Sequence, residues 1–90
     1  MPHKRTGPYF ERLEAHVAGQ VKALRFRQGL TQGEVAKAAG VTDKFVSRIE
    51  TAGENLSLHS IGALAQALRV KPGDLLPRGE EPQVSSKRAI

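Results

Sequence analysis

The 90-residue chain contains no cysteine. This absence excludes a disulfide framework, a thiolate metal site and a cysteine nucleophile. No apolar run is long enough for a signal peptide or a membrane span, so we expect a cytoplasmic protein without membrane contact. The 3 histidines lie far apart, and none stands at metal-ligand spacing. No glycine-rich phosphate loop or nucleophile elbow is present. The sequence therefore predicts no enzyme, no cofactor and no metal site.

The charge balance is basic, with a formal net charge of +5 and a pI of about 10.1. A positive surface is what a binder of polyanions needs, because each neutralised phosphate releases counterions. The same charge also serves simply to keep a small domain soluble, so charge alone decides little. The chain length allows one domain.

No segment has the alternating pattern of a strand, and apolar residues recur instead at helical spacing. This spacing predicts helices over residues 10–28, 32–39, 43–51 and 58–68, and a short fifth helix that opens at Pro72 and ends at Leu75 and Leu76. We expect a disordered arm, one domain and a flexible tail over residues 1–9, 10–76 and 77–90.

Three of the helix starts share one local pattern. An apolar residue precedes a hydroxyl N-cap, and another apolar residue stands four positions into the helix, which is the hydrophobic staple. The predicted caps are Thr31, Thr42 and Ser57. Glu34 stands three residues after Thr31 and would complete a capping box. Losing such a cap costs roughly 1 kcal/mol, which is substantial for a small domain.

Residues 32–51 carry the most informative pattern. Ala36 is small where two crossing helices would touch, and Gly40 stands where the chain must turn sharply. Val46 and Ile49 give the next helix an apolar edge that can lie on the preceding one. This order of small residue, glycine and apolar pair predicts a helix-turn-helix.

From about residue 17 to residue 76, the sequence resembles the Cro/C1-type (XRE-like) helix-turn-helix family of transcription regulators. The matching residues are Arg25, Gly29 to Gln32, Val35, Ala36, Gly40 to Thr42, Val46 to Glu50, Asn55, Ser57, Leu58, Ala65 to Leu68, Val70, Leu75 and Leu76. The resemblance implies an all-α fold, a compact lambda-repressor-like bundle of five helices. It also implies a homodimer on a roughly palindromic operator. Within the family, the length, Phe45 and residues 55–58 are similar to restriction-modification controller proteins.

If Val46 and Ile49 face inward, the opposite face of the same helix is free to read bases in a DNA groove. The predicted base-contacting residues are Asp43, Lys44, Ser47 and Arg48. Arg48 suits a bidentate contact to guanine, and Lys44 a guanine or a phosphate. A solvated helix face is the alternative interpretation. Asp43 would either accept a hydrogen bond from cytosine N4 or simply stabilise the helix start.

The phosphate backbone is expected to meet Gln32, Thr42, Thr51, Asn55, Arg27 and Lys37. The family places Gln32 on a phosphate with help from the helix N-terminus. Gly33 departs from the family, which usually has a longer side chain there. Arg25 and Glu50 occupy positions where the family often has an ion pair that orients the recognition helix.

The fourth helix carries more apolar surface than a small bundle can hide, which predicts a dimer interface. Its expected residues are Leu58, Ile61, Leu64, Leu68, Leu75 and Leu76. Regulation would come from occupying a promoter, as a repressor does, or from contacting RNA polymerase. The alternative function is that of an antitoxin-like interaction protein, because family antitoxins use the same domain to neutralise a partner.

Overall fold

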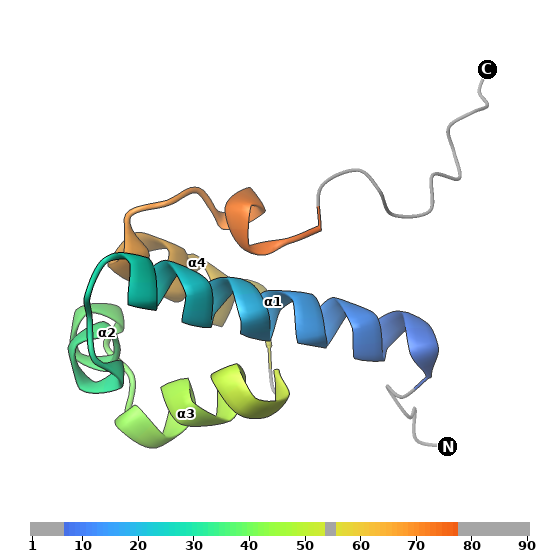
Figure 1. The fold of residues 1–90 in the computed structure, drawn as a ribbon, viewed down its shortest axis with the longest axis horizontal. Coiled ribbons are helices and arrows are strands. Elements are labelled where there is room, and N and C mark those ends of the chain that lie inside the picture. The colour runs from blue at the N-terminus through green and yellow to red at the C-terminus, as the bar shows by residue number, and fades with distance from the viewer. Residues whose placement is uncertain (1–6, 54–55, 78–90) are drawn as a thin grey trace.

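The computed structural model describes residues 7–53 and 56–77. Within these residues the chain forms α1 (Pro8–Arg27), α2 (Gln32–Ala39), α3 (Asp43–Ala52), α4 (Leu58–Leu68) and the 3-10 helix η1 (Pro72–Leu75). In Figure 1, α1 crosses the view, with α2 at its C-terminal end, α3 below it and α4 behind it. Helices α3 and α4 and the turn η1 contact α1, whereas α2 packs on α3 and α4.

The core draws at least one fully buried side chain from every one of these elements. Its largest members are Val17, Val21, Val35, Val46, Ile49, Leu64, Leu68 and Leu75. Each such side chain contributes about 1.5–3 kcal/mol on leaving water. The apolar edge of α3 is therefore fixed on α1 and α2, as the sequence pattern predicts.

The predicted N-caps explain why three helices start where they do. Thr31 Oγ1 accepts a hydrogen bond from the N–H of Glu34 at 3.0 Å, and Thr42 Oγ1 accepts one from Phe45 at 3.0 Å. Ser57 Oγ does the same for the N–H of Ser60 at 3.0 Å. Each bond satisfies a donor that has no partner inside its own helix. The predicted starts at residues 32, 43 and 58 are confirmed.

The prediction of five α-helices is wrong for the described part of the chain, which has four and a single 3-10 turn. The last element spans only Pro72–Leu75. Proline has no N–H to donate, glycine follows it directly, and Pro77 stops any continuation. A four-residue turn held by the bond from Lys71 N–H to Asp74 Oδ2 at 2.9 Å is what this composition supports.

The first helix begins earlier than predicted, so Pro8 and Tyr9 belong to α1 and not to an arm. Proline suits the first helical position because its fixed φ matches the helix and its missing N–H would have no partner there. The first turns of α1 extend beyond the other helices in Figure 1, and Phe10 in these turns is 42% exposed. Residues 1–6 and 78–90 lie outside the described residues.

Candidate nucleic-acid interface

A tight turn at Gly40 connects α2 to α3. Gly40 has a φ of 75°, in the left-handed region that glycine adopts without a Cβ penalty. The N–H of Val41 then reaches back to the carbonyl of Ala36 at 3.0 Å and closes the end of α2. Ala36 is 1% exposed, and Val46 and Ile49 are fully buried. The predicted helix-turn-helix is thus present, with its apolar contacts in the expected places.

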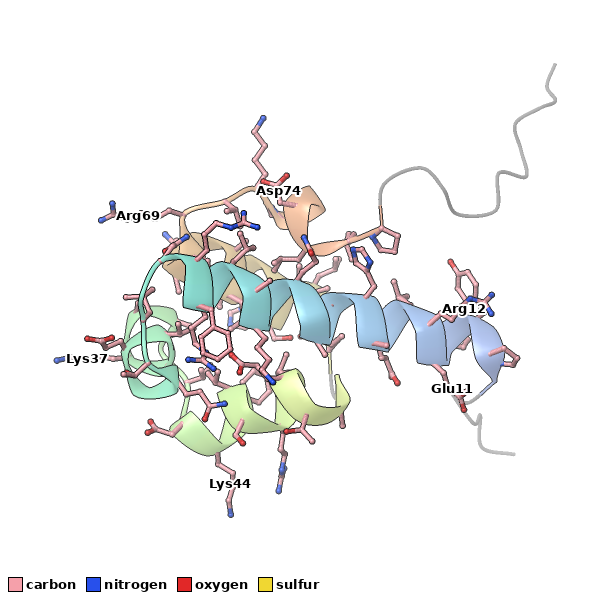
Figure 2. The ribbon with its side chains drawn as sticks, viewed as in Figure 1. Glu11, Arg12, Lys37, Lys44, Arg69 and Asp74 are labelled. Carbon is pink, nitrogen blue, oxygen red and sulfur yellow. The ribbon has the colours of Figure 1, made fainter. Side chains whose placement is uncertain are left out.

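One face of α3 remains open to solvent. Asp43, Lys44, Arg48 and Thr51 are exposed, and Ser47 is half-buried. Figure 2 shows Lys44 projecting away from the body of the molecule. The same helix therefore presents cationic hydrogen-bond donors outward and an apolar edge inward, which is the arrangement that groove reading requires.

An ion pair between Arg25 on α1 and Glu50 on α3 lies behind this face. Arg25 Nε donates to Glu50 Oε2 at 2.7 Å, and Arg25 Nη2 donates to Oε1 at 2.9 Å. Such a two-point contact fixes the relative orientation of the two side chains as well as their distance.

Arg25 has two further contacts. Its Nη1 donates to the carbonyl of Leu30 at 2.9 Å, in the connection between α1 and α2. The guanidinium carbon lies 4.5 Å from the ring centre of Phe26, an exposed aromatic that the sequence interpretation missed.

The Glu50 carboxylate is almost completely hidden, with 3% of its side chain exposed. Burial alone raises the pKa of this carboxyl group. The hydrogen bonds from Arg25 and Gln32, together with the charges of Arg25 and Lys22, outweigh burial and hold the pKa below its ordinary value. The same contact raises the pKa of Arg25. The pair is therefore ionised at neutral pH and links α1 to α3.

Gln32, the first residue of α2, joins this network. Its Nε2 donates to Glu50 Oε1 at 3.1 Å, so part of its hydrogen-bonding capacity is used within the subunit. Gln32 is half-buried, so some of its atoms remain accessible to DNA. Its contact with a phosphate stays a prediction.

The other predicted phosphate contacts are spread over several elements. Arg27, Lys37 and Thr51 are exposed, and Thr42 is exposed while its hydroxyl caps α3. Figure 2 shows that Lys37 leaves α2 in a different direction from the one in which Lys44 leaves α3. Asn55 lies outside the described residues.

The structure brings Gly33 and Asp43 together, which the sequence interpretation missed. A Cβ atom added to Gly33 would lie 3.3 Å from Asp43 Oδ2. The available signal was a glycine at a position where the family usually has a longer side chain. Sequence spacing could not identify Asp43 as its neighbour, because the two residues stand on different helices.

The expected dimer surface needs correction. Leu64, Leu68 and Leu75 are fully buried inside the subunit, so their assignment to an interface is wrong. The apolar face of α4 is buried in the subunit's own core, because α2 and η1 pack against it. Leu58 is 87% exposed, whereas Ile61 and Leu76 are half-buried. Only these last three of the six predicted residues have surface to offer a partner.

The family model for a helix-turn-helix domain matches residues 16–78. The chain therefore belongs to the helix-turn-helix domain family. The comparison with curated proteins yields no match. In the part of the chain that the structure covers, no helix is both long and apolar enough to cross a membrane.

Solved structures of regulators share the fold. The restriction-modification controller protein C.AhdI from Aeromonas hydrophila is 30% identical, with a TM-score of 0.67 over 70% of this chain and 96% of its own. The hypothetical transcription factor NHTF from Neisseria is 29% identical, with a TM-score of 0.71 over 90% and 91%. The controller protein C.Esp1396I is 27% identical, with a TM-score of 0.64 over 67% and 78%. Domain and fold are those of XRE-type DNA-binding transcription regulators, as the sequence predicts.

Proposed function

We propose that this protein is a sequence-specific transcription regulator that binds a roughly palindromic operator as a homodimer. The observation that carries the proposal is the exposed face of α3, which presents Lys44 and Arg48 while Val46 and Ile49 are fully buried. In a dimer, two such helices about 34–36 Å apart would enter successive major grooves. Regulation follows from occupying a promoter or from contacting RNA polymerase there.

The ion pair network supports this proposal because groove reading needs a fixed helix direction. Arg25, Glu50 and Gln32 connect α1, α3 and the start of α2 through hydrogen bonds of 2.7–3.1 Å. We assign this network the role of orienting α3. Arg25 and Glu50 then need no contact with bases.

The direct test is a selection of bound duplexes from random DNA, followed by fluorescence anisotropy on the enriched sequence. We expect one enriched sequence with two-fold symmetry, and binding that weakens steeply with added salt because phosphates are neutralised. Recovery of no enriched sequence contradicts the proposal. A protein partner recovered in place of DNA would instead favour the antitoxin-like function.

The second test identifies the reading face. Arg48→Ala should weaken operator binding by about 1–3 kcal/mol and relax the preference at one base pair. Arg69→Ala is the matched control, because it removes the same charge from the end of α4, where the side chain points in a different direction from Lys44 (Figure 2). If both variants lose the same affinity and keep the same base preference, the assignment of Arg48 is wrong.

A narrower role is supported by the likeness to C.AhdI, whose identity to this chain is 30%. We propose that the regulated genes belong to a restriction-modification system. The operator obtained by selection should then lie upstream of adjacent methyltransferase and nuclease genes. An operator located elsewhere would contradict the restriction-modification role without contradicting the general role of transcription regulator.

A further inference from the structure

The starts of α2 and α3 touch at one point in the helix-turn-helix. Gly33 is the second residue of α2, and Asp43 is the first residue of α3. An ideal Cβ on Gly33 would lie 3.3 Å from Asp43 Oδ2 and 3.9 Å from Asp43 Cγ. Contacts of 3.3 Å are tighter than ordinary van der Waals contact, so with a side chain on residue 33 the Asp43 carboxylate would have to shift by a few tenths of an ångström. The Asp43 carboxylate therefore occupies room that exists because residue 33 is glycine.

The carboxylate also lies beside the start of α2, where the proposed contact of Gln32 would bring a DNA phosphate. The start of a helix carries a partial positive charge and unpaired N–H groups, which favour an anion. In α2 the capping threonine serves the N–H groups of Glu34 and Val35, through Thr31 Oγ1 and the Thr31 carbonyl. The N–H groups of Gln32 and Gly33 take no part in these bonds. Two carboxylates lie at this helix start, that of Glu34, which accepts from the N–H of Thr31 at 2.8 Å, and that of Asp43.

A phosphate brought to this corner meets a like charge, whatever the DNA sequence. The repulsion is offset only where a base offers an amino group to Asp43, as cytosine N4 or adenine N6 does in the major groove. A carboxylate at this point thus weakens binding to most sequences and spares those with an amino group in reach.

We propose that Gly33 is a positioning residue for DNA specificity. The absence of a side chain at residue 33 leaves room for the Asp43 carboxylate beside the start of α2, and this carboxylate discriminates against DNA without an amino group there. The inference rests on the proposed DNA binding and assigns a second specificity element beside Arg48.

The test is a double-mutant cycle with Gly33→Ala, Asp43→Ala and the double variant, each measured on the selected operator and on a random duplex. Alanine at 43 has nothing beyond Cβ, so a side chain at 33 has no carboxylate to displace. We expect Asp43→Ala to tighten binding to the random duplex by about threefold, as for the removal of one nearby like charge. The ratio of operator to random binding should fall by about tenfold.

Gly33→Ala alone should lower that ratio and broaden the base preference at the single position that Asp43→Ala broadens. In the Asp43→Ala background, Gly33→Ala should change neither the ratio of operator to random binding nor the base preference. Far-UV circular dichroism and thermal unfolding establish that all variants are folded, and alanine at 33 favours the helix. A purely structural role of Gly33 would not change the preference at one base pair.

Two results overturn the inference alone while the wild-type protein still selects a sequence. One is an identical effect of Gly33→Ala in both backgrounds. The other is weaker binding of Asp43→Ala to operator and random duplex alike. If the wild-type protein enriches no sequence at all, the proposed function fails and this inference fails with it.

Discussion

Gly53 ends α3 at the point where this helix meets α1. Its φ is 67°, and a Cβ atom there would lie 2.5 Å from the carbonyl oxygen of Glu14. The obstacle is backbone, which cannot rotate away as a long side chain can. Gly53 therefore allows the C-terminal end of α3 to dock on the N-terminal half of α1.

Gly53→Ala should accordingly destabilise the fold more than its backbone angle alone explains. Gly29→Ala is the matched control, because Gly29 has a φ of 71° and nothing within 4 Å of an added Cβ. The control should lose about 1–2 kcal/mol of unfolding free energy from left-handed strain. Gly53→Ala should lose about 1–3 kcal/mol more from the steric conflict. Urea unfolding followed by circular dichroism compares the two, and equal losses would show that the contact with Glu14 is easily relieved.

Glu50 gives the stability of the fold a predictable response to acid. Its pKa in the folded state is lowered by Arg25 and Gln32, in spite of burial. A carboxyl group with a lowered folded-state pKa contributes its full stability above its unfolded-state value of about 4.3. That contribution is lost as the pH falls through the lower folded-state pKa.

Glu50→Gln should therefore cost most at neutral pH, where it leaves Arg25 buried without its counter-ion. The expected loss there is about 3–5 kcal/mol. The gap between wild type and variant should narrow as the pH falls below about 4.3. Chemical unfolding at a series of pH values measures this difference in unfolding free energy. Glu11→Gln, on the exposed start of α1, is the control. A gap that stays constant with pH would show that the carboxylate charge is not what stabilises the network.

At the scale of the element, α4 ends in a strained conformation. Arg69 has a φ of 61°, and it is the only residue other than glycine with positive φ in the described ranges 7–53 and 56–77. Its N–H closes the helix onto the carbonyls of Ala65 and Gln66. Helices commonly end in this left-handed position, but glycine occupies it without the Cβ penalty.

Arg69→Gly should therefore raise the unfolding free energy by about 0.5–1 kcal/mol, since the relief of strain exceeds the entropy that glycine adds to the unfolded chain. Arg69→Ala removes the same charge and keeps a Cβ atom, so it should bring no gain. Thermal unfolding of the three proteins decides between the causes. A gain of equal size in the alanine variant would attribute the effect to charge instead of backbone conformation.

The helix starts could be predicted because they depend on neighbouring residues. Thr31, Thr42 and Ser57 each bond to an N–H three positions later, so a short stretch of sequence contains both partners. The approach of Asp43 to Gly33, and of Gly53 to Glu14, could not be predicted in this way. These contacts depend on the angle at which two helices cross, which no local pattern fixes.

In the candidate site, too, local spacing predicted some features and not others. Asp43, Lys44 and Arg48 could be placed on an exposed face because Val46 and Ile49 define the buried one. The pairing of Arg25 with Glu50 could be predicted only from the family resemblance. With 24 residues between them in the sequence, no local spacing indicates that they meet. Spacing on one helix could not show how much of α4 the subunit itself would bury. For that reason the leucines of the core were assigned to an interface.

At the scale of the whole molecule, one patch of apolar surface lies between α1 and the start of α4. Leu58 is 87% exposed at the edge of a groove of about 240 Å³. Leu13, Leu56, Ile61 and Leu76 also line this groove. A two-fold symmetric interface uses one patch twice, so a single substitution there affects both subunits.

Leu58→Glu should leave the subunit folded, because the side chain is not part of the core, and should weaken the proposed dimer strongly. Loss of one leucine from each side of the interface removes about 1.5–3 kcal/mol per side chain and places two carboxylates near each other. Sedimentation velocity over a range of concentrations should show monomers where the wild-type protein is dimeric. Operator binding should then require more protein and lose its dependence on both half-sites. His59→Glu, which adds the same charge at the neighbouring exposed position, should preserve the dimer. A wild-type protein that sediments as a monomer at every concentration, or a Leu58→Glu variant that dimerises normally, would remove this surface from the proposal.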